Sequence, residues 1–204
     1  MNYGQFLNMV PEFYLVLILL AVFVVDFVMH RSEKKLDILY VVTVALLAVL
    51  PVRIVLLANP AEAFGGLYVA SEAVNVMKAI LAFGTLIVAL MAQPWLKQTQ
   101  RLAGEFYLLL ISTLLGMFIM MSSGNFLLFF LGLEMASVPL ACMVAFDKWK
   151  QNSAEGAAKY ILMATFSSGV MLYGISFIYG AAGTLYFDDA AKALTASPLA
   201  IMGS

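Results

Sequence analysis

Six long apolar stretches follow one another along the chain, separated by short segments that hold most of the charged residues. A helix needs about 20 residues to cross the hydrocarbon core of a bilayer, and each stretch has about that length. None alternates apolar and polar residues as the strands of a membrane barrel do. The pattern therefore predicts an all-α membrane protein with six transmembrane helices, at 13–29, 38–57, 74–91, 106–121, 126–146 and 157–182.

The connections between these stretches are short, and no low-complexity tract or flexible linker interrupts the chain. Only residues 122–125 separate the fourth and fifth stretches, which predicts a tight antiparallel helical hairpin. The longest connection, 58–73, holds Pro60, Gly65 and Gly66 and is interpreted as an ordered loop.

The composition excludes most soluble functions. The chain is 64% hydrophobic and 11% charged, whereas a soluble domain carries about 25% charged residues. A net charge of -1 argues against a nucleic-acid partner. One cysteine, Cys142, and one histidine, His30, do not suffice for a disulfide, an iron–sulfur cluster or a metal site within this chain. Residues 1–12 contain no lysine or arginine, whereas a signal peptide has basic residues before its apolar run. The first stretch is therefore predicted to be a membrane span that is retained and not a signal peptide that is cleaved.

Basic residues mark one side of the predicted bundle. The connections after the first, third and fifth spans carry seven of them, and the connections after the second and fourth carry none. Because basic loops stay in the cytoplasm, these three connections are predicted to be cytoplasmic and the N-terminus to lie outside. Trp95 and Trp149 lie beside them, as interfacial anchors do. The seven basic residues are Arg31, Lys34, Lys35, Lys97, Arg101, Lys148 and Lys150.

Glu134 is the ionisable residue placed deepest in a predicted span. About 12 Å of helix precede it and about 18 Å follow it, so its side chain cannot reach either surface. Ser137 shares its helix face, and Pro139 leaves the carbonyl of Met135 without its usual helical donor. An acid in mid-membrane beside a hydratable backbone is suited to holding a proton. The alternative is a protonated glutamate that links two helices by a hydrogen bond.

Lys159 lies near the cytoplasmic start of the sixth span, one turn after Glu155. The spacing favours an ion pair between them, and such a pair would act as an interfacial anchor. A lysine near a helix N-terminus opposes the helix dipole, however. Since the fifth and sixth spans are consecutive and antiparallel, a water-bridged approach of Lys159 to Glu134 would give one coupled titrating unit.

The other intramembrane residues receive structural interpretations. Asp26 and Arg53 lie within about one turn of their helix ends, and Lys78 lies one turn into the third span. All three are predicted to extend to the membrane surface. Gly132 and Ala136 form a face of small residues that lets a neighbouring helix approach closely, and Cys142 is predicted to be a small buried hydrophobe.

Four runs of residues carry a resemblance to a known family. Residues 131–140 read L-G-L-E-M-A-S-V-P-L, and the runs 104–110, 153–160 and 172–185 keep the spacing around them. Together, over 104–187, they resemble the antiporter-like subunit N of bacterial respiratory complex I. The core pattern L-G-L-E-x-x-S-x-P-L is specific to the superfamily that this subunit shares with Mrp-type antiporters. The first hundred residues fit only in their pattern of helices.

The resemblance implies a 14-helix antiporter-like fold with two inverted five-helix repeats, each with a broken helix. Residues 1–103 would then be three N-terminal transmembrane helices. Residues 104–204 would be the start of the first repeat, helices 4–6, ending before helix 7. Glu134 and Lys159 match the fifth-helix glutamate and sixth-helix lysine assigned to the family's proton path. The sequence stops at Ser204, where the family's seventh helix should begin, and lacks its second repeat, so this chain is not expected to conduct protons alone.

The function implied is that of a membrane-arm subunit in a proton-pumping NADH–quinone oxidoreductase of the bacterial plasma membrane. NADH, flavin, iron–sulfur clusters and quinone would be bound by partner subunits, and this chain would hold no cofactor and form no stand-alone monomer. An Mrp-type cation/proton antiporter subunit is the nearest alternative. A non-conducting membrane scaffold with a neutral Glu134 is another. A small-metabolite carrier is disfavoured, because no pair of discontinuous helices is visible in the sequence.

Overall fold

The computed structural model describes residues 8–29, 35–98, 103–147 and 150–194. Among the predicted cytoplasmic residues, Lys97 and Lys150 have described side chains, and Lys35 opens a helix. His30 and five further residues of the sequence analysis lie outside the described residues: Arg31, Lys34, Arg101, Lys148 and Trp149.

Six of the helices are long and apolar enough to cross a membrane, which confirms the prediction of a multi-pass all-α membrane protein. Most begin a few residues before their predicted start, because the polar residues that flank an apolar stretch continue the helix. They are α1 (Val10–Val28), α2 (Lys35–Leu57), α3 (Glu72–Gln98), α4 (Ala103–Met121), α5 (Phe126–Val144) and α6 (Gln151–Ala182).

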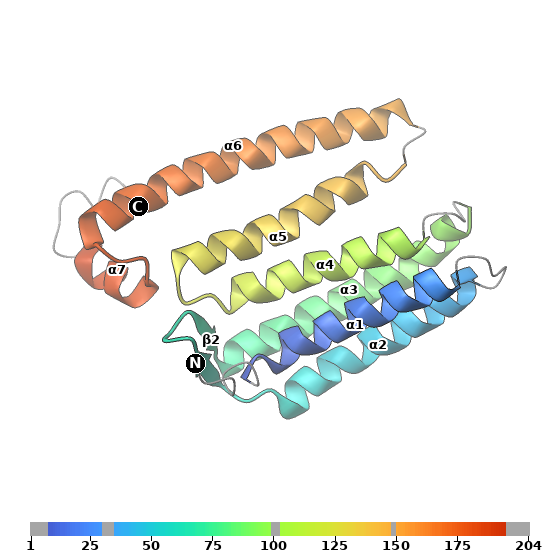
Figure 1. The fold of residues 1–204 in the computed structure, drawn as a ribbon, viewed down its shortest axis with the longest axis horizontal. Coiled ribbons are helices and arrows are strands. Elements are labelled where there is room, and N and C mark those ends of the chain that lie inside the picture. Colours follow the sequence, from blue (N-terminus) through green and yellow to red (C-terminus); the bar gives the residue numbers. More distant parts are fainter. Residues whose placement is uncertain (1–7, 30–34, 99–102, 148–149, 195–204) are drawn as a thin grey trace.

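Three short elements at one end of the bundle escaped the sequence analysis. The ordered loop between α2 and α3 contains an antiparallel hairpin of β1 (Ala61–Ala63) and β2 (Tyr68–Ala70). Its turn uses the left-handed region at Phe64, Gly65 and Gly66 (φ 56°, 65° and 87°). After α6, the amphipathic helix α7 (Phe187–Leu194) lies at the same end of the molecule as the hairpin and the start of α1 (Figure 1).

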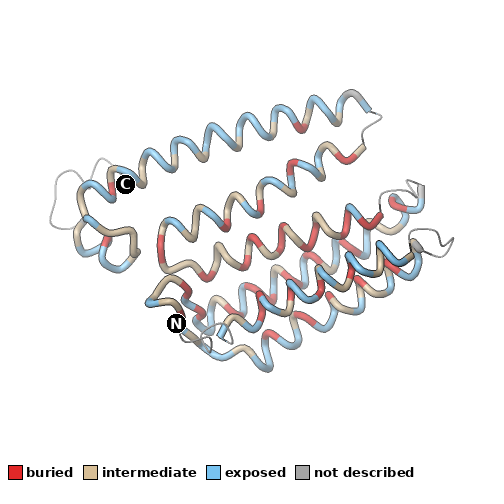
Figure 2. Tube along the Cα trace, viewed as in Figure 1, coloured by how far each residue is buried: buried red, intermediate tan, exposed pale blue. Residues whose placement is uncertain are grey.

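Helix α4 lies at the centre of the arrangement. On one side it packs against the bundle of α1, α2 and α3, and on the other it packs against α5, which in turn carries α6 (Figure 1). Buried residues follow α4 and its contacts with the first three helices, whereas α6 is exposed along most of its length (Figure 2). The described core therefore joins helices 1–4, with α5 and α6 added to one side.

Small residues set the close packing of α4 and α5. A Cβ added to Gly132 of α5 would collide with the backbone of Met120, and one added to Gly116 of α4 would collide with the backbone of Ala136. Helix backbones approach this closely only where side chains are small. The structure thus confirms both the tight helical hairpin and the small-residue face of Gly132 and Ala136.

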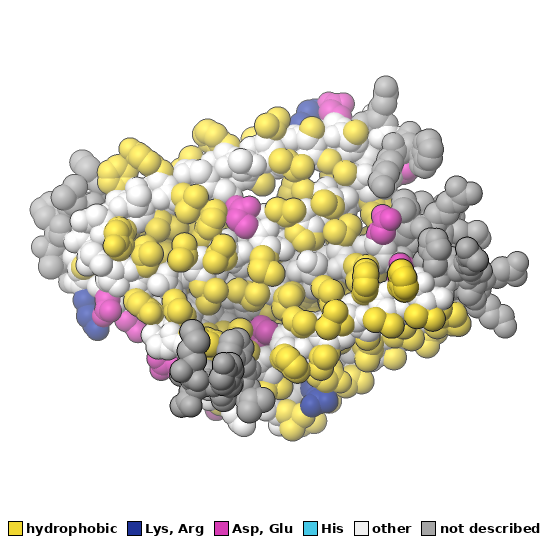
Figure 3. Space-filling view, in the orientation of Figure 1, with side chains coloured by type: hydrophobic (Ala, Val, Ile, Leu, Met, Phe, Trp, Pro, Cys, Tyr) yellow, Lys and Arg dark blue, Asp and Glu magenta, His cyan; other side chains and the backbone are white. Residues whose placement is uncertain are grey.

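The molecular surface fits a bilayer solvent. Hydrophobic side chains cover the helices in the view of Figure 3, and lysine and arginine side chains appear only toward its periphery. Cys142 contradicts its predicted burial, because its side chain is exposed beside α4. The reason is that Cys142 lines a groove between α4 and α5, which separates its side chain from close packing at this end of the molecule.

The orientation of the bundle in the membrane leads to a prediction. With Cys142 replaced by serine, a cysteine introduced at Lys150 should react with a membrane-impermeant maleimide only in inverted vesicles, because basic connections stay in the cytoplasm. A cysteine at Glu62, on the hairpin at the opposite end of the bundle, is the matched control and should react in intact cells. Labelling of the Lys150→Cys variant from outside intact cells would reverse the orientation.

Candidate functional site

Glu134 lies between α5 and α6 as a half-buried carboxyl group held by hydroxyls. Ser168 of α6 donates a short hydrogen bond to Oε1. Ser137, one turn along α5, lies 3.2 Å from the Glu134 carbonyl oxygen and 3.5 Å from Oε2. The side chain thus finds polar partners inside the protein, as an acid placed far from either membrane surface requires.

The position of Glu134 is fixed by the helix that carries it. Asn125 caps α5, where its side-chain oxygen accepts a hydrogen bond from the backbone N–H of Leu127 at 2.7 Å. The helix then runs through Pro139 to Val144. Its contact with α4 at Gly132 lies half a turn from Glu134, so the two side chains occupy different sides of the helix. The Glu134 carboxyl group is consequently directed toward α6.

Ser168 is a site residue that the sequence analysis missed. It belongs to the Ser167–Ser168 pair in the middle of α6, and two adjacent hydroxyls in an apolar span were a usable signal. Ser168 is half-buried, whereas Ser167 is exposed. Helix periodicity alone does not select between the two, because the face of α6 that meets α5 is set by tertiary packing.

Lys159 lies apart from Glu134. Its side chain is 73% exposed and forms an ion pair with Glu155 at 2.5 Å, as the i,i+4 spacing predicted. Lys159 precedes Ser168 by nine residues, which amounts to about 13 Å along the helix and two and a half turns. The two side chains therefore leave opposite faces of α6, and the structure does not bring Lys159 and Glu134 together.

Lys78 contradicts its sequence interpretation. Its side chain is fully buried and does not extend to the membrane surface. The Lys78 Nζ lies 2.5 Å from Oε1 of Glu12 in α1 and 3.2 Å from the hydroxyl of Tyr68 in β2. Tyr68 in turn donates a hydrogen bond of 2.9 Å to Glu12 Oε2, and Ser122 lies 3.4 Å from Oε1. Tyr68 of the hairpin lies against Lys78, and no local sequence pattern around Lys78 indicates this contact.

This set of side chains, Glu12, Tyr68, Lys78 and Ser122, is here called the outer cluster. Burial, followed by the negative charge of Glu12, raises the pKa of the Tyr68 phenol well above its usual value, so Tyr68 stays protonated and acts as a donor to Glu12. The Lys78 ammonium also lies over the rings of Tyr68 and Phe118, at 5.2 and 5.7 Å from their centroids. Removing one partner of such a buried pair typically costs about 3–5 kcal/mol.

The remaining charges near helix ends play packing roles. Arg53 is exposed and places its guanidinium carbon 4.4 Å from the centroid of the Tyr14 ring. Asp26 is half-buried, with its carboxylate directly against Gly104 of α4, where a Cβ would overlap it. Asp26 therefore lies against a neighbouring helix, and Arg53 alone keeps the exposure expected of a residue that reaches the membrane surface.

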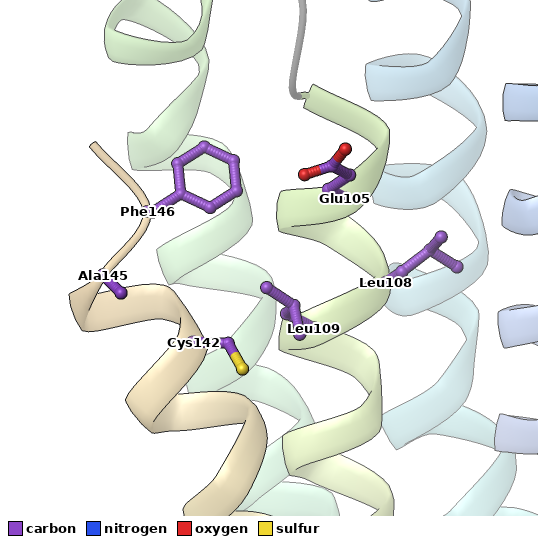
Figure 4. A pocket seen from close by; sticks show the side chains of 6 residues that line it. All are labelled: Glu105, Leu108, Leu109, Cys142, Ala145 and Phe146. Carbon is purple, nitrogen blue, oxygen red and sulfur yellow. The ribbon is translucent and has the colours of Figure 1, made fainter. Parts of the chain in front are cut away.

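A groove of about 500 Å³ opens between α4 and α5 near the start of α4 (Figure 4). Glu105 stands at its rim, and Cys142 points toward Leu109 across it. The groove does not include Glu134 or Lys159. Within the four described segments of the chain, no group of three or more His, Cys, Asp or Glu side chains could hold a metal ion.

The chain is similar to membrane subunits of respiratory complexes in both sequence and structure. Residues 123–203 match the family described as NADH:quinone oxidoreductase/Mrp antiporter, transmembrane. In structure, 95% of the chain superposes on 42% of a chain of respiratory complex I from Thermus thermophilus with bound aureothin, with a TM-score of 0.67 and 25% identity. A chain of an archaeal membrane-bound sulfane sulfur reductase gives the same TM-score and coverage at 20% identity, which supports the fold alone. The fold is that of an antiporter-like membrane subunit.

Curated relatives make the resemblance specific. The NADH-quinone oxidoreductase subunit N of Phocaeicola vulgatus is 47% identical over 99% of the chain, and that of Azobacteroides pseudotrichonymphae is 39% identical over all of it. The chain is therefore a relative of NADH-quinone oxidoreductase subunit N, which confirms the resemblance found in its motifs. The chain spans 43% of the length of each of these two relatives.

The contact between Glu134 and Ser168 leads to a prediction. Ser168→Ala removes a donor to the carboxyl group without changing the helix, and a hydrogen bond of this kind is worth about 1 kcal/mol. If Glu134 exchanges protons, proton uptake by membrane vesicles during NADH oxidation should slow by roughly fivefold. Ser167→Ala removes the neighbouring exposed hydroxyl and should have no effect. Equal effects of the two variants would show that the Ser168 contact has no special role.

Proposed function

We propose that this chain is a membrane-arm subunit of a proton-pumping NADH–quinone oxidoreductase and contributes part of a proton path. The observation that carries the proposal is the half-buried Glu134 carboxyl group, held by serine hydroxyls from two membrane-spanning helices. A carboxyl group in this setting can hold a proton and release it when a neighbouring charge or conformation changes.

Glu134 and Lys159 have different parts in this proposal. Glu134 is the mid-membrane site at which a proton is held. Lys159, paired with Glu155 at the predicted cytoplasmic end of α6, is the site at which a proton enters. Lys159 and Ser168, the α6 partner of Glu134, leave opposite faces of α6 and lie about 13 Å apart along it, so water or a neighbouring helix has to connect Lys159 with Glu134. Their coupling is therefore through the path and not through direct contact.

The proposal extends to the surroundings of the chain. Residues 1–103 form three N-terminal helices, and residues 104–204 begin the first antiporter-like repeat of a 14-helix fold. The chain lies in the bacterial plasma membrane with its N-terminus outside, beside other membrane-arm subunits. It contains no redox centre itself, and NADH, flavin, iron–sulfur clusters and quinone belong to partner subunits. Quinone reduction there drives the change that Glu134 and Lys159 experience.

A non-conducting scaffold is the alternative function that an observation favours. The hydrogen bond between Ser168 and Glu134 also suits a protonated glutamate that joins α5 to α6 and never titrates. The two functions differ in one respect, because a scaffold needs only the hydrogen bond, whereas a proton path needs a group that ionises. An Mrp-type antiporter subunit would use the same site with a cation as the counter-transported ion.

Isosteric replacement of Glu134 separates the proton path from the scaffold. Glu134→Gln keeps the shape and the hydrogen bonds but cannot ionise, so the complex should assemble while proton uptake during NADH oxidation falls at least tenfold, since proton-transfer groups typically contribute about 10²–10⁴-fold. Glu134→Asp should be intermediate. In the same assay Lys159→Met should impair uptake more than Lys159→Arg, which keeps the charge.

The control for this experiment is Glu72→Gln, which makes the same chemical change at an exposed glutamate in the first turn of α3. It should leave proton uptake unchanged. Uptake is normalised to the amount of assembled complex, so that loss of protein is not counted as loss of pumping. Normal uptake by the Glu134→Gln variant would assign Glu134 to the scaffold function.

A further inference from the structure

The outer cluster joins four separate segments at the hairpin end of the bundle. Glu12 comes from the first turn of α1, Lys78 from α3, and Tyr68 from β2, and Ser122 is the residue that follows α4. Their mutual contacts satisfy both carboxylate oxygens of Glu12 and leave the Lys78 side chain without exposure. An arrangement of these segments that separates Glu12 from Lys78 would leave a buried charge unpaired, which is strongly destabilising.

Backbone hydrogen bonds continue from the outer cluster to the start of α5. The amide of Val69 donates to the carbonyl of Ser122 at 2.8 Å, and the amide of Gly124 donates to the carbonyl of Leu67 at 2.8 Å. Gly124 also lies so close to the carbonyl oxygen of Gly66 that a Cβ would overlap it. The hairpin is therefore hydrogen-bonded to residues 122 and 124 of the connection between α4 and α5.

The same connection is fastened to the end of α6. Phe126, the first residue of α5, donates its amide hydrogen to the carbonyl of Leu185 at 3.0 Å, and Phe187 donates to the carbonyl of Gly124 at 3.2 Å. The hairpin and the segments 122–126 and 185–187, here called the outer layer, thus form one continuous hydrogen-bonded strip at this end of the bundle (Figure 1).

The outer layer ties the start of α5 to the segment that follows α6. Glu134 follows Phe126 by eight residues, about 12 Å along a rigid helix, and Ser168 lies on α6, whose far end leads into Leu185. Because both helices are held by the same layer, a distortion within that layer would change the position of Glu134 relative to Ser168. We propose that the outer cluster of Glu12, Tyr68 and Lys78 is a positioning site that sets the register between Glu134 and Ser168. This inference rests on the proposed function of Glu134.

A charge-removal cycle in the assembled complex tests the positioning role. Lys78→Met or Glu12→Gln alone leaves a buried charge unpaired, so each should lower the amount of assembled complex several-fold. The double variant removes both charges and should restore assembly to within about twofold of the parent. Lys97→Met, which breaks an exposed ion pair with Asp37, is the matched control and should change nothing.

Two measurements on the assembled double variant then separate positioning from stability. Hydrogen–deuterium exchange of peptides that cover 122–126 and 185–187 should be faster than in the parent, because the outer layer has lost its anchor. Protons taken up per NADH oxidised should fall as far as in Glu134→Gln, and adding Glu134→Gln to the double variant should lower the ratio no further, because both changes act on one route.

Unchanged exchange in the outer layer, a normal proton ratio in the double variant, or a loss that adds to that of Glu134→Gln would each overturn the positioning role. Failure of the proposed function is recognised separately. In that case Glu134→Gln alone pumps normally, while the exchange measurement, which needs no proton transport, still reports whether the outer cluster holds the outer layer.

Discussion

A glutamate side chain in the middle of a membrane-spanning helix cannot reach the water at either membrane surface. The positions of α5 and its neighbours are consistent with this constraint. Glu134 has to find polar partners within the protein, and it finds them in Ser137 on its own helix and Ser168 on the next. These hydroxyls are useful only if α5 lies at a fixed height and rotation. Gly116 and Gly132 supply the close contact with α4 that fixes the rotation, and the cap at Asn125 marks where the helix begins.

Glu12 and Glu134 are both glutamates in largely apolar surroundings, but they have different kinds of partners. Glu12 forms an ion pair with Lys78 at 2.5 Å and accepts a hydrogen bond from Tyr68, so a cation lies directly beside its carboxylate. Glu134 has only neutral serine hydroxyls as donors among the hydrogen bonds described for it. The first arrangement suits the fixing of a structure, and the second suits the exchange of a proton. The outer layer connects the two.

The sequence sufficed for features that depend on local pattern. Apolar length predicted the six spans, and the i,i+4 spacing predicted the pair of Lys159 with Glu155. Depth within a span singled out Glu134, whose role in proton transfer stays a prediction. The sequence did not suffice where partners are distant. Lys78 was assigned to the membrane surface because its partner, Glu12, lies 66 residues away in the chain, and its cover comes from a hairpin whose strands have three residues each. The separation of Lys159 from Glu134 follows from the rotation of α6, which only its packing against α5 determines.

Infrared difference spectroscopy of the assembled complex tests most directly whether Glu134 changes its protonation during turnover. Spectra recorded before and during NADH oxidation report the gain and loss of protonated carboxyl groups. We expect a change in a carboxyl band in the parent, and we expect this change to disappear in the Glu134→Gln variant. In the Ser168→Ala variant the band should shift in frequency, because Ser168 donates a hydrogen bond to that carboxyl group. Difference spectra that are identical in the parent and in Glu134→Gln would contradict this expectation.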